Sequence, residues 1–537
     1  MNKRMVLAAA ALLLAACSSS APQQASGQGK STANEVAIDT GRVSGVVSDG
    51  VLAFKGVPFA APPVGELRWR APQPAARWSG VRAAAEYGHD CMQEPFPSDA
   101  APLGTPPAED CLYLNVWRPD SSAKKLPVMV WIYGGGFVNG GSSPPTYSGA
   151  LLAKQGVMVV SFNYRLGRFG SFAHPALTKV AADGGLIGNY GYMDQVAALK
   201  WVKRNIAAFG GNPDQVTIVG ESAGGGSVHT LVTSPMAKGL FQRGVVMSGG
   251  GRGSLMGEAT IASAEKIGLA FARTKGITDD DPDALKKLRA LSAEAVTDKL
   301  SMVALARPGE RTFSSPMIDG KLAVEAPSVA YEHDRFARVP MMIGATSNDI
   351  GGRSTAADKD ALFAQFGANA ARARAAFDPD GTVPLAELNR QVGLLTGAMI
   401  EPARYMNALL SAKGVPSWEY RFSYVADSVR TPKTVGAGHA TDIPFFFDTV
   451  TIKYGAATTP KDANIGHAMS AYLVNFVKTG DPNGAGLPSS GLPKWERYSP
   501  AADPIMDFGA DGIAKPQKDP LGPQLDAAKA LAEAQRK

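Results

Sequence analysis

The stretch that most constrains the fold of this chain covers residues 209–225 and reads FGGNPDQVTIVGESAGG. Its centre is Ser222, which follows a β-prone run at 216–219 and precedes a segment at 227–232 that can wind into a helix. A serine in a strained turn between a strand and a helix, flanked by glycines, is the sequence form of a nucleophile elbow. A plain glycine- and serine-rich loop is the alternative, so the pattern predicts a nucleophile only if partners occur elsewhere in the chain.

Strand and helix signals alternate through most of the sequence. Runs rich in β-branched and aromatic residues predict buried strands at 128–133, 157–162, 216–219, 244–247, 339–343 and 418–422. Helical patterns lie between them, the clearest at 192–209 and 468–477, and a final helix is expected at 524–535. This alternation predicts an α/β fold with a large, mostly parallel central sheet flanked by helices.

Two segments depart from the alternation. Residues 43–54 read as an antiparallel hairpin with Asp49 and Gly50 at its turn. Residues 261–305 are helical and charged, and we expect them to form part of a cap over the site rather than a separate domain.

Residues 1–16 read as a targeting segment. Lys3 and Arg4 precede an apolar stretch that is too short to span a bilayer. The end of this stretch, Leu-Ala-Ala-Cys at 14–17, resembles the lipobox of bacterial lipoproteins. That resemblance implies lipidation of Cys17, which then becomes the N-terminus. An ordinary signal peptide followed by an incidental cysteine is the alternative.

The chain therefore divides into three predicted parts. Residues 1–16 form a signal peptide of the lipoprotein type, residues 17–34 form a flexible tether, and residues 35–537 form a single domain. By resemblance to bacterial lipoproteins, Ser18 after the cysteine favours sorting to the outer membrane. We expect an exported protein, lipid-anchored there and facing the periplasm or the exterior, or otherwise periplasmic or secreted.

Charge and composition exclude one class of partner. Lys and Arg number 54 and Asp and Glu number 48, which gives a net charge of +6. These charges are scattered and form no basic run, so the sequence predicts no nucleic-acid partner. Contact with a membrane is expected only through the N-terminal lipid, and nothing in the sequence predicts an oligomeric state.

Cys91 and Cys111 are the two cysteines beyond Cys17. In an exported protein they most simply form a disulfide that closes a surface loop. A reactive thiol is less favoured because neither cysteine lies in a nucleophile context. Two isolated cysteines also lack the close spacing of a zinc site. We expect no metal and no organic cofactor.

A serine hydroxyl becomes a strong nucleophile when an imidazole takes its proton and a carboxylate orients that imidazole. The chain has six histidines, His89, His174, His229, His333, His439 and His467. The first two precede Ser222, the third lies along the helix that Ser222 opens, and the last lies at the start of an amphipathic helix. His439 is favoured over His333 because it lies in a glycine-rich loop, GAGHATDIPFFFD, after the strand at 418–422. A structural loop histidine is the alternative.

The acid should follow a strand between the serine and the histidine in the sequence. The strand at 339–343 runs into the loop GATSNDIGG, which contains Asp349, whereas Glu325 and Glu332 lie in weaker contexts. An Asn-Asp pair before glycines also commonly shapes a turn. Asp349 is favoured as the acid because it lies in the loop directly after the strand at 339–343.

Backbone amides that could bind an oxyanion are expected at two places. Gly134, Gly135 and Gly136 directly follow the strand at 128–133, where no side chain blocks their amides. Ala223 supplies another amide at the positive end of its helix. No GxxxxGK[ST] pattern surrounds the glycines, so they are not expected to bind phosphate.

With these residues in place, the chain resembles the type B carboxylesterases, the family that also contains the cholinesterases. The matching segments extend over nearly all of the mature body, from FKGVPFAAPPVGELRWRAPQP at 54 through EDCLYLNVW at 109, WIYGGGF at 131, GNYGYMDQVAALKWV at 188 and the Ser222 stretch to NFVKTGDPN at 475. The resemblance implies an α/β-hydrolase fold with helical cap insertions. It also implies a carboxylic ester hydrolase that acts on small-molecule esters through an acyl-enzyme.

Carried over by position, the resemblance assigns roles to individual residues. Ser222 would be the nucleophile, Asp349 the acid and His439 the base, and the oxyanion donors would be Gly135, Gly136 and Ala223. The Cys91–Cys111 pair would be the first disulfide loop of the family. Glu221 would shape the electrostatics beside the nucleophile, although a purely structural role is equally open.

Some positions depart from the family pattern. Many members have Glu followed by Gly at the acid position, where this chain has Asp349 and Ile350. The loop between Cys91 and Cys111 contains no tryptophan, and Gly352 replaces an aromatic residue after the acid. Because choline is bound by aromatic rings, a choline ester is not expected. An amidase or an acyl transferase is an alternative function, because it would use the same triad. A non-catalytic cholinesterase-like binding protein is a further alternative, because it would keep the same fold.

Overall fold

The computed structural model describes residues 34–536 apart from 97–98, 100, 254–258, 306–307 and 485–490. The predicted signal peptide, most of the tether and the lipidation site Cys17 therefore lie outside the described residues. Within the described residues, no helix is both long and apolar enough to cross a membrane.

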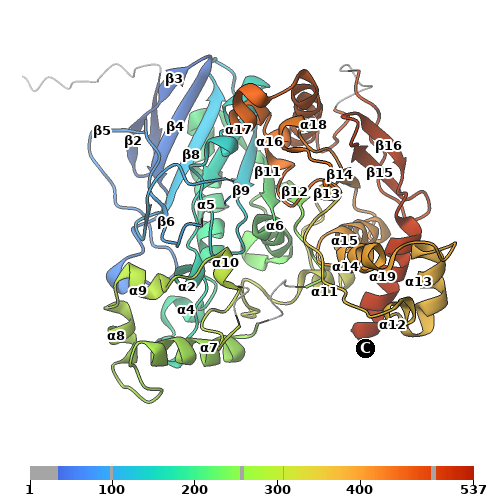
Figure 1. The fold of residues 1–537 in the computed structure, drawn as a ribbon. Helices are drawn as coiled ribbons and strands as arrows, with labels where there is room; N and C mark the ends of the chain where they lie inside the picture. The colour runs from blue at the N-terminus through green and yellow to red at the C-terminus, as the bar shows by residue number, and fades with distance from the viewer. Residues whose placement is uncertain are drawn as a thin grey trace, which may run out of the picture. The chain divides into compact units, whose positions relative to one another are not determined.

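An eleven-stranded sheet organises the fold (Figure 1), with the strand order β16-β15-β14-β13-β12-β11-β9-β10-β8-β4-β3. In chain order the strands are β3 (Val46–Ser48), β4 (Val51–Pro58), β8 (Tyr113–Pro119), β9 (Leu126–Ile132), β10 (Met158–Phe162), β11 (Gly211–Glu221), β12 (Arg243–Met247), β13 (Met341–Thr346), β14 (Ser417–Phe422), β15 (Pro504–Phe508) and β16 (Ala514–Lys518). Neighbours from β15 to β10 pair in parallel, and the pairs at both edges are antiparallel. The predicted mostly parallel sheet is confirmed.

Several central strands are buried along their whole length because helices pack on them. Every residue of β13 and β14 is buried, as is every residue of β10. All six strands predicted from short apolar runs are present, since a run buried on both faces gives a strong local signal. The helices α6 (Ala223–Thr233), α15 (Ile400–Ala412) and α18 (Pro460–Thr479) pack directly on these strands.

The predicted hairpin is confirmed in part. Strands β3 and β4 are antiparallel, and Asp49 and Gly50 at their turn have φ values of 50° and 73°. Val43, however, belongs to β2 (Gly41–Ser44), which forms a separate three-stranded sheet with β1 (Glu35–Ile38) and β5 (Val81–Ala83). The chain changes sheets at Gly45, where an added Cβ would lie 2.6 Å from the carbonyl oxygen of Ala53.

The predicted helices are present, and one of them begins at a capping box. The pattern at 192–209 corresponds to α5 (Tyr190–Asn205) followed by a short 3-10 turn, and the final helix is α19 (Gly522–Gln535). Helix α18 begins earlier than predicted because Thr459 and Asp462 form a capping box. His467 therefore lies inside this helix and not at its start, and its exposed ring pairs with Asp448 (Nδ1 to Oδ1, 2.7 Å).

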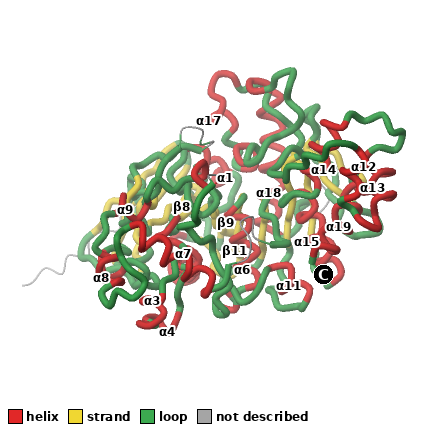
Figure 2. The backbone as a smooth tube through the Cα atoms, turned by 60° about the horizontal axis from the view of Figure 1, so that its bottom comes forward, coloured by secondary structure: helices red, strands yellow, loops and turns green. Residues whose placement is uncertain are grey.

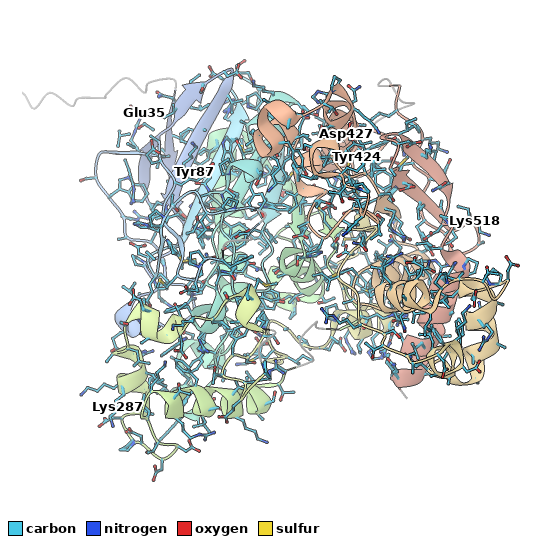
Figure 3. All side chains as sticks on the ribbon, viewed as in Figure 1. Glu35, Tyr87, Lys287, Tyr424, Asp427 and Lys518 are labelled. Atoms are coloured by element: carbon cyan, nitrogen blue, oxygen red, sulfur yellow. A yellow bond between two sulfur atoms is a disulfide. The ribbon has the colours of Figure 1, made fainter. Side chains whose placement is uncertain are left out.

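The first turn of α18 is also tied to the loop after β14. The Asp462 carboxylate accepts hydrogen bonds from the Tyr424 hydroxyl (2.6 Å) and from the Asp427 amide (3.1 Å). Figure 3 labels Tyr424 and Asp427, whose side chains lie close together beside this helix. Because α18 packs against α16 (Ile443–Phe446), these bonds help to fix the segment that follows His439.

Two separate groups of helices lie beside the sheet, one toward the lower left of Figure 1 and the other toward its lower right, and Figure 2 also shows them apart. One contains α7 (Ile261–Thr274), α8 (Ala284–Arg289), α9 (Ala293–Thr297) and α10 (Met302–Leu305), as predicted for residues 261–305. The other was not predicted and contains α12 (Lys359–Ala364), α13 (Ala370–Phe377) and α14 (Leu385–Leu395), which share a hydrophobic cluster with α19.

The disulfide between Cys91 and Cys111 is present, and both residues are buried. It closes the loop that includes β6 (Asp90–Cys91) and β7 (Pro107–Ala108). The cross-link predicted from the two cysteines is confirmed.

Candidate active site

Ser222 lies in the turn between β11 and α6, where its backbone has φ 56° and ψ −121°. This conformation is strained for a residue with a Cβ atom. The Ser222 amide donates to the carbonyl oxygen of Met247 at the end of β12 (2.9 Å). An added Cβ at Gly220 would overlap Gly224, and one at Gly224 would overlap Ile132. The turn predicted from the glycine pattern is present for this steric reason.

Three residues that are far apart in the sequence meet at this turn. His439 Nε2 lies 2.8 Å from Ser222 Oγ, and His439 Nδ1 lies 2.6 Å from Asp349 Oδ1. Ser222 follows β11, Asp349 follows β13, and His439 lies in the loop after β14. Parallel strands place their carboxyl ends at one edge of the sheet, so these loops converge.

The Asp349 carboxylate is buried and accepts several other hydrogen bonds. Ser248 Oγ donates to Oδ2 (2.6 Å), and the amide and hydroxyl of Thr346 donate to the same oxygen (3.0 and 2.9 Å). Burial alone would raise the pKa of Asp349, but the hydrogen bond and charge of His439, aided by Ser248 and the Ile350 amide, hold that pKa below its usual range. Asp349 therefore stays ionised and fixed in orientation.

Two further buried acids lie beside His439. Glu221 Oε1 is 3.2 Å from His439 Nε2, and Asp442 accepts a hydrogen bond from the Tyr420 hydroxyl (2.8 Å). Burial raises the pKa of Glu221 to about 8, with smaller contributions from Asp442 and Asp349. Burial also raises the pKa of Asp442 to about 6.

These acids determine the protonation of His439. Burial alone would lower the pKa of the imidazole, but Glu221, Asp349 and Asp442 outweigh it and raise that pKa to about 9. Each acid favours the positively charged ring by Coulombic attraction in a site of low dielectric. The arrangement therefore stabilises the imidazolium that would form if His439 took the proton of Ser222.

Unpaired backbone amides border the same serine. Gly135 and Gly136 have φ values of 99° and 61°, and Gly134 lies directly against Ser222. Among the described residues, the amides of Gly135, Gly136 and Ala223 donate to no protein acceptor. Ala223 is the first residue of α6, so the partial positive charge of the helix terminus adds to its amide. This set of donors can stabilise a developing oxyanion.

Gln93 and Asn139 hold the glycine turn in place, and sequence reasoning missed both. The Gly140 amide donates to Gln93 Oε1 (2.9 Å), and Gln93 Nε2 donates to the Gly140 carbonyl oxygen (2.6 Å). Asn139 Nδ2 also donates to Gln93 Oε1 (3.2 Å). Gln93 lies two residues after Cys91, so the disulfide loop supports the turn. Nothing in the sequence distinguishes these amides from ordinary polar loop residues.

Two cavities meet at Ser222. The smaller has a volume of about 230 Å³ and is lined in part by Glu221 and His439. The larger has a volume of about 510 Å³ and is lined in part by Gly136 and Ala223. Met302 of α10 lines both cavities and Leu305 lines the larger one, so the end of the segment 261–305 borders the site.

The other histidines have partners elsewhere. His89 Nδ1 bonds to the Pro106 carbonyl oxygen (2.9 Å), and His174 Nδ1 accepts from the Ala176 amide (3.1 Å). His333 lies 2.7 Å from an Arg335 nitrogen. His229 is buried in the wall of the larger cavity, where burial lowers its pKa to about 4 and so keeps it neutral.

The remaining predicted acids also lie in other contacts. Glu325 pairs with Arg335, and Glu332 accepts from the Tyr405 hydroxyl (2.5 Å) and from Arg536 (2.6 Å). Within the described ranges, no group of three His, Cys, Asp or Glu residues could hold a metal ion.

A mostly parallel sheet with a serine turn after β11, and with an acid and a histidine on later loops, defines an α/β-hydrolase. The model of the "Carboxylesterase family" matches residues 32–375 and 386–520. The chain belongs to the carboxylesterase family.

Individual relatives agree with this assignment. The para-nitrobenzyl esterase of Bacillus subtilis (strain 168) is 36% identical over 467 residues, covering 83% of this chain and 90% of the relative. The fumonisin B1 esterase of Sphingopyxis macrogoltabida is 34% identical over 505 residues, covering 88% and 85%. A solved structure of a PNB esterase matches with a TM-score of 0.76 at 32% identity, covering 93% of this chain and 99% of that chain. The family and these relatives support ester hydrolysis.

Proposed function

We propose that this protein hydrolyses carboxylic esters through an acyl-enzyme formed on Ser222. The observation that carries the proposal is the continuous hydrogen-bonded chain from Asp349 through His439 to Ser222. In the first step His439 Nε2 takes the hydroxyl proton while Oγ attacks the carbonyl carbon. The amides of Gly135, Gly136 and Ala223 then stabilise the oxyanion.

The remaining steps use the same groups. His439 gives its proton to the oxygen of the departing alcohol, which leaves the acid bonded to Ser222 Oγ. Water then enters, and His439 takes one of its protons while the water oxygen attacks the acyl carbon. As the tetrahedral intermediate breaks its bond to Ser222 Oγ, His439 returns the proton to Oγ, which releases the free acid and restores the serine. Asp349 stays ionised throughout and orients the imidazole.

Covalent labelling tests this function directly. A fluorophosphonate should modify one residue per chain, Ser222, and esterase activity should fall in proportion to the labelled fraction. Peptide mapping by mass spectrometry locates the label, and 4-nitrophenyl acetate hydrolysis reports activity. Full activity in a completely labelled sample, or a label on another residue, contradicts the proposal.

A Glu221→Gln variant is expected to shift the pH dependence of kcat/KM. His439 must be neutral to take the serine proton, so its raised pKa means that activity falls as the pH drops through about 9. Removing the Glu221 charge lowers the pKa of His439, and the acid limb should therefore move to lower pH by about one unit. The plateau of kcat/KM at high pH should also fall, because the imidazolium formed during the reaction loses a stabilising neighbour. A Glu332→Gln variant serves as the control, and an unmoved or raised midpoint in Glu221→Gln contradicts the assignment.

A Gly135→Ala variant is expected to lower kcat by about 100- to 1,000-fold, the cost of losing an oxyanion donor. The new Cβ would overlap Asn139, and φ at this position is 99°, so the turn and its amides must move. Gly239→Ala is the matched control, since Gly239 also has a positive φ (79°) but has no atom within 4 Å of an added Cβ. Steady-state kinetics on a short ester should separate the two variants. Equal kcat values would show that Gly135 does not act as an oxyanion donor.

We also propose that the protein is exported and anchored in the outer membrane by lipid on Cys17. The support is the charged start, the short apolar stretch and the Leu-Ala-Ala-Cys sequence at 14–17. Mass spectrometry of the native N-terminus should find an acylated Cys17. An N-terminus at residue 18 or later, without lipid, contradicts this proposal.

A further inference from the structure

Asn139 is a buried residue at which three separate segments of the chain meet. It lies in the glycine turn that follows β9, and it is 1% exposed. Its Oδ1 accepts a hydrogen bond from the Met302 amide at the start of α10 (2.8 Å). Its Nδ2 donates to the Glu94 carbonyl oxygen (2.8 Å) and to Gln93 Oε1 (3.2 Å), both in the disulfide loop. Asn139 therefore joins the glycine turn to the disulfide loop and to α10.

The carboxamide of Asn139 has only one favourable orientation here. A backbone amide such as that of Met302 can only donate, and a carbonyl oxygen such as that of Glu94 can only accept. Turning the carboxamide over would set donor against donor and acceptor against acceptor. Asn139 also borders the smaller cavity, but both hydrogens of its side chain are used by protein acceptors, so none is left for an oxyanion. A role in the reaction must therefore act through the groups that Asn139 positions.

The backbone of Asn139 fixes the direction of one oxyanion amide. The amides of Val138 and Asn139 donate to the Gly135 carbonyl oxygen (3.0 and 2.9 Å). This carbonyl and the Gly136 amide belong to one planar trans peptide unit and point in opposite directions, so the Gly136 amide is aimed out of the turn. A Cβ atom added at Gly135 would lie 2.2 Å from the Asn139 carbonyl oxygen. The two backbones are in direct contact, so a shift of Asn139 disturbs both donors.

Gln93 supports the next residue of the turn in the same way. Its carboxamide exchanges two hydrogen bonds with the backbone of Gly140 (2.9 and 2.6 Å) and donates to the Cys91 carbonyl oxygen (2.9 Å). The bond from Asn139 completes the set, and Gln93 is 4% exposed. A buried polar group that loses its partner is costly, so removal of either side chain would also weaken the hold of the other. Asn139 and Gln93 therefore act as one unit on the turn.

Building on the proposed esterase function, we propose that Asn139 is a positioning residue for ester hydrolysis. It keeps the amides of Gly135 and Gly136 aimed at the oxyanion by joining the glycine turn to the disulfide loop and to α10. The negative charge on the substrate oxygen develops fully only on the way to the tetrahedral intermediate. Misplaced amides should therefore lower kcat with little effect on KM.

An Asn139→Ala variant of the full chain tests the proposal. Its kcat on 4-nitrophenyl acetate should fall about 100-fold, the cost of a displacement of about 1 Å in a catalytic site, while KM changes by less than about threefold. The affinity for an alkyl trifluoromethyl ketone should fall by a similar factor, because its adduct with Ser222 carries the oxyanion. A kcat within about threefold of the wild type, or a loss confined to KM, would overturn the proposal.

Two further variants separate positioning from folding. Asn205 is 3% exposed at the end of α5, where its Oδ1 accepts from the Asp39 amide (2.9 Å) and its Nδ2 donates to the Trp201 carbonyl oxygen (3.2 Å). Asn205→Ala should lower the unfolding temperature yet keep kcat, and an equal loss of kcat in both alanine variants would contradict positioning by Asn139. Asn139→Asp keeps the acceptor for Met302 and loses the two donors. If Asn139→Ala does not fold, kcat of Asn139→Asp should still fall at least about tenfold, and an unchanged kcat would count against the proposal.

A double variant tests whether the two side chains act together. Gln93→Ala should also lower kcat, and the double variant with Asn139→Ala should lose little more than the weaker of the two single variants, because both hold one turn. Losses that multiply would show that Asn139 does not act through the disulfide loop. Wild-type turnover and labelling of Ser222, measured in the same series, keep these outcomes distinct from a failure of the esterase function itself.

Discussion

A Ser222→Ala variant is expected to hydrolyse esters about a million-fold more slowly than the wild type, with its fold unchanged. The serine hydroxyl is the group that would bond to the acid, and neither His439 nor the free amides can replace it. Loss of the nucleophile in a serine hydrolase typically costs a factor of this size in kcat. Alanine has the same backbone as serine with one atom less, so the strained turn at φ 56° should persist.

The measurement needs a matched serine and a test of folding. Ser227→Ala removes a buried hydroxyl one turn further along α6, where Ser227 Oγ donates to the Ala223 carbonyl oxygen (2.9 Å) and accepts from Gln195 Nε2 (3.0 Å). This control should retain activity within about tenfold of the wild type, because neither hydrogen bond involves His439 or Asp349. Circular dichroism should match for all three proteins, and Ser222→Ala should unfold at a temperature at least as high as that of Ser227→Ala, which loses buried hydrogen bonds. A Ser222→Ala protein that keeps measurable turnover after rigorous purification would contradict the proposed nucleophile.

The sequence predicted the parts of the fold that have local signals. Strands buried on both faces, such as β9 and β13, are continuous apolar runs. The Ser222 turn is marked by glycines that have no room for a Cβ. The positions of Asp349 and His439 followed from strand order, because parallel strands bring their loops to one edge. Their hydrogen-bonded arrangement required the structure.

The strands and helices that the sequence did not predict have weak or non-local sequence signals. Strand β15 begins with Pro504, strand β16 is exposed at most positions, and both pair only at the edge of the sheet. The helices α12 to α14 are short, and their hydrophobic cluster forms only with α19, which is distant in the sequence. Early helix starts, as in α18, depend on capping bonds that hydrophobic periodicity does not show.

The supporting residues of the site were also beyond sequence reasoning. Ser248 donates to Asp349 from the loop after β12, and Gln93 binds the glycine turn from the disulfide loop. A serine or a glutamine in a loop is common, and its partner becomes visible only when distant loops meet. Asp442 follows His439 by three residues, yet its effect on the imidazole arises from complete burial, which the sequence does not reveal.

An Asp349→Asn variant is expected to lower kcat by about 10,000-fold, as seen when the acid of a serine triad is neutralised. Asp349 Oδ1 accepts the Nδ1 hydrogen of His439 at 2.6 Å, which leaves Nε2 free to take the serine proton. Ser248 and Thr346 donate to the other oxygen, Oδ2, so asparagine would place its oxygen there and its amide group toward Nδ1. The ring would then carry its hydrogen on Nε2, the tautomer that cannot accept a proton from Ser222.

A second Asp–His pair in the same chain provides the control for this variant. Asp448 and His467 form a contact of similar length, 2.7 Å, on the exposed face of α18. Asp448→Asn should therefore leave kcat unchanged, although it breaks the same type of pair. Steady-state kinetics and NMR of the imidazole nitrogens would report activity and tautomer together. If Asp349→Asn retains kcat within about tenfold of the wild type, another group must orient His439, and buried Glu221 or Asp442 would be the next acid to replace.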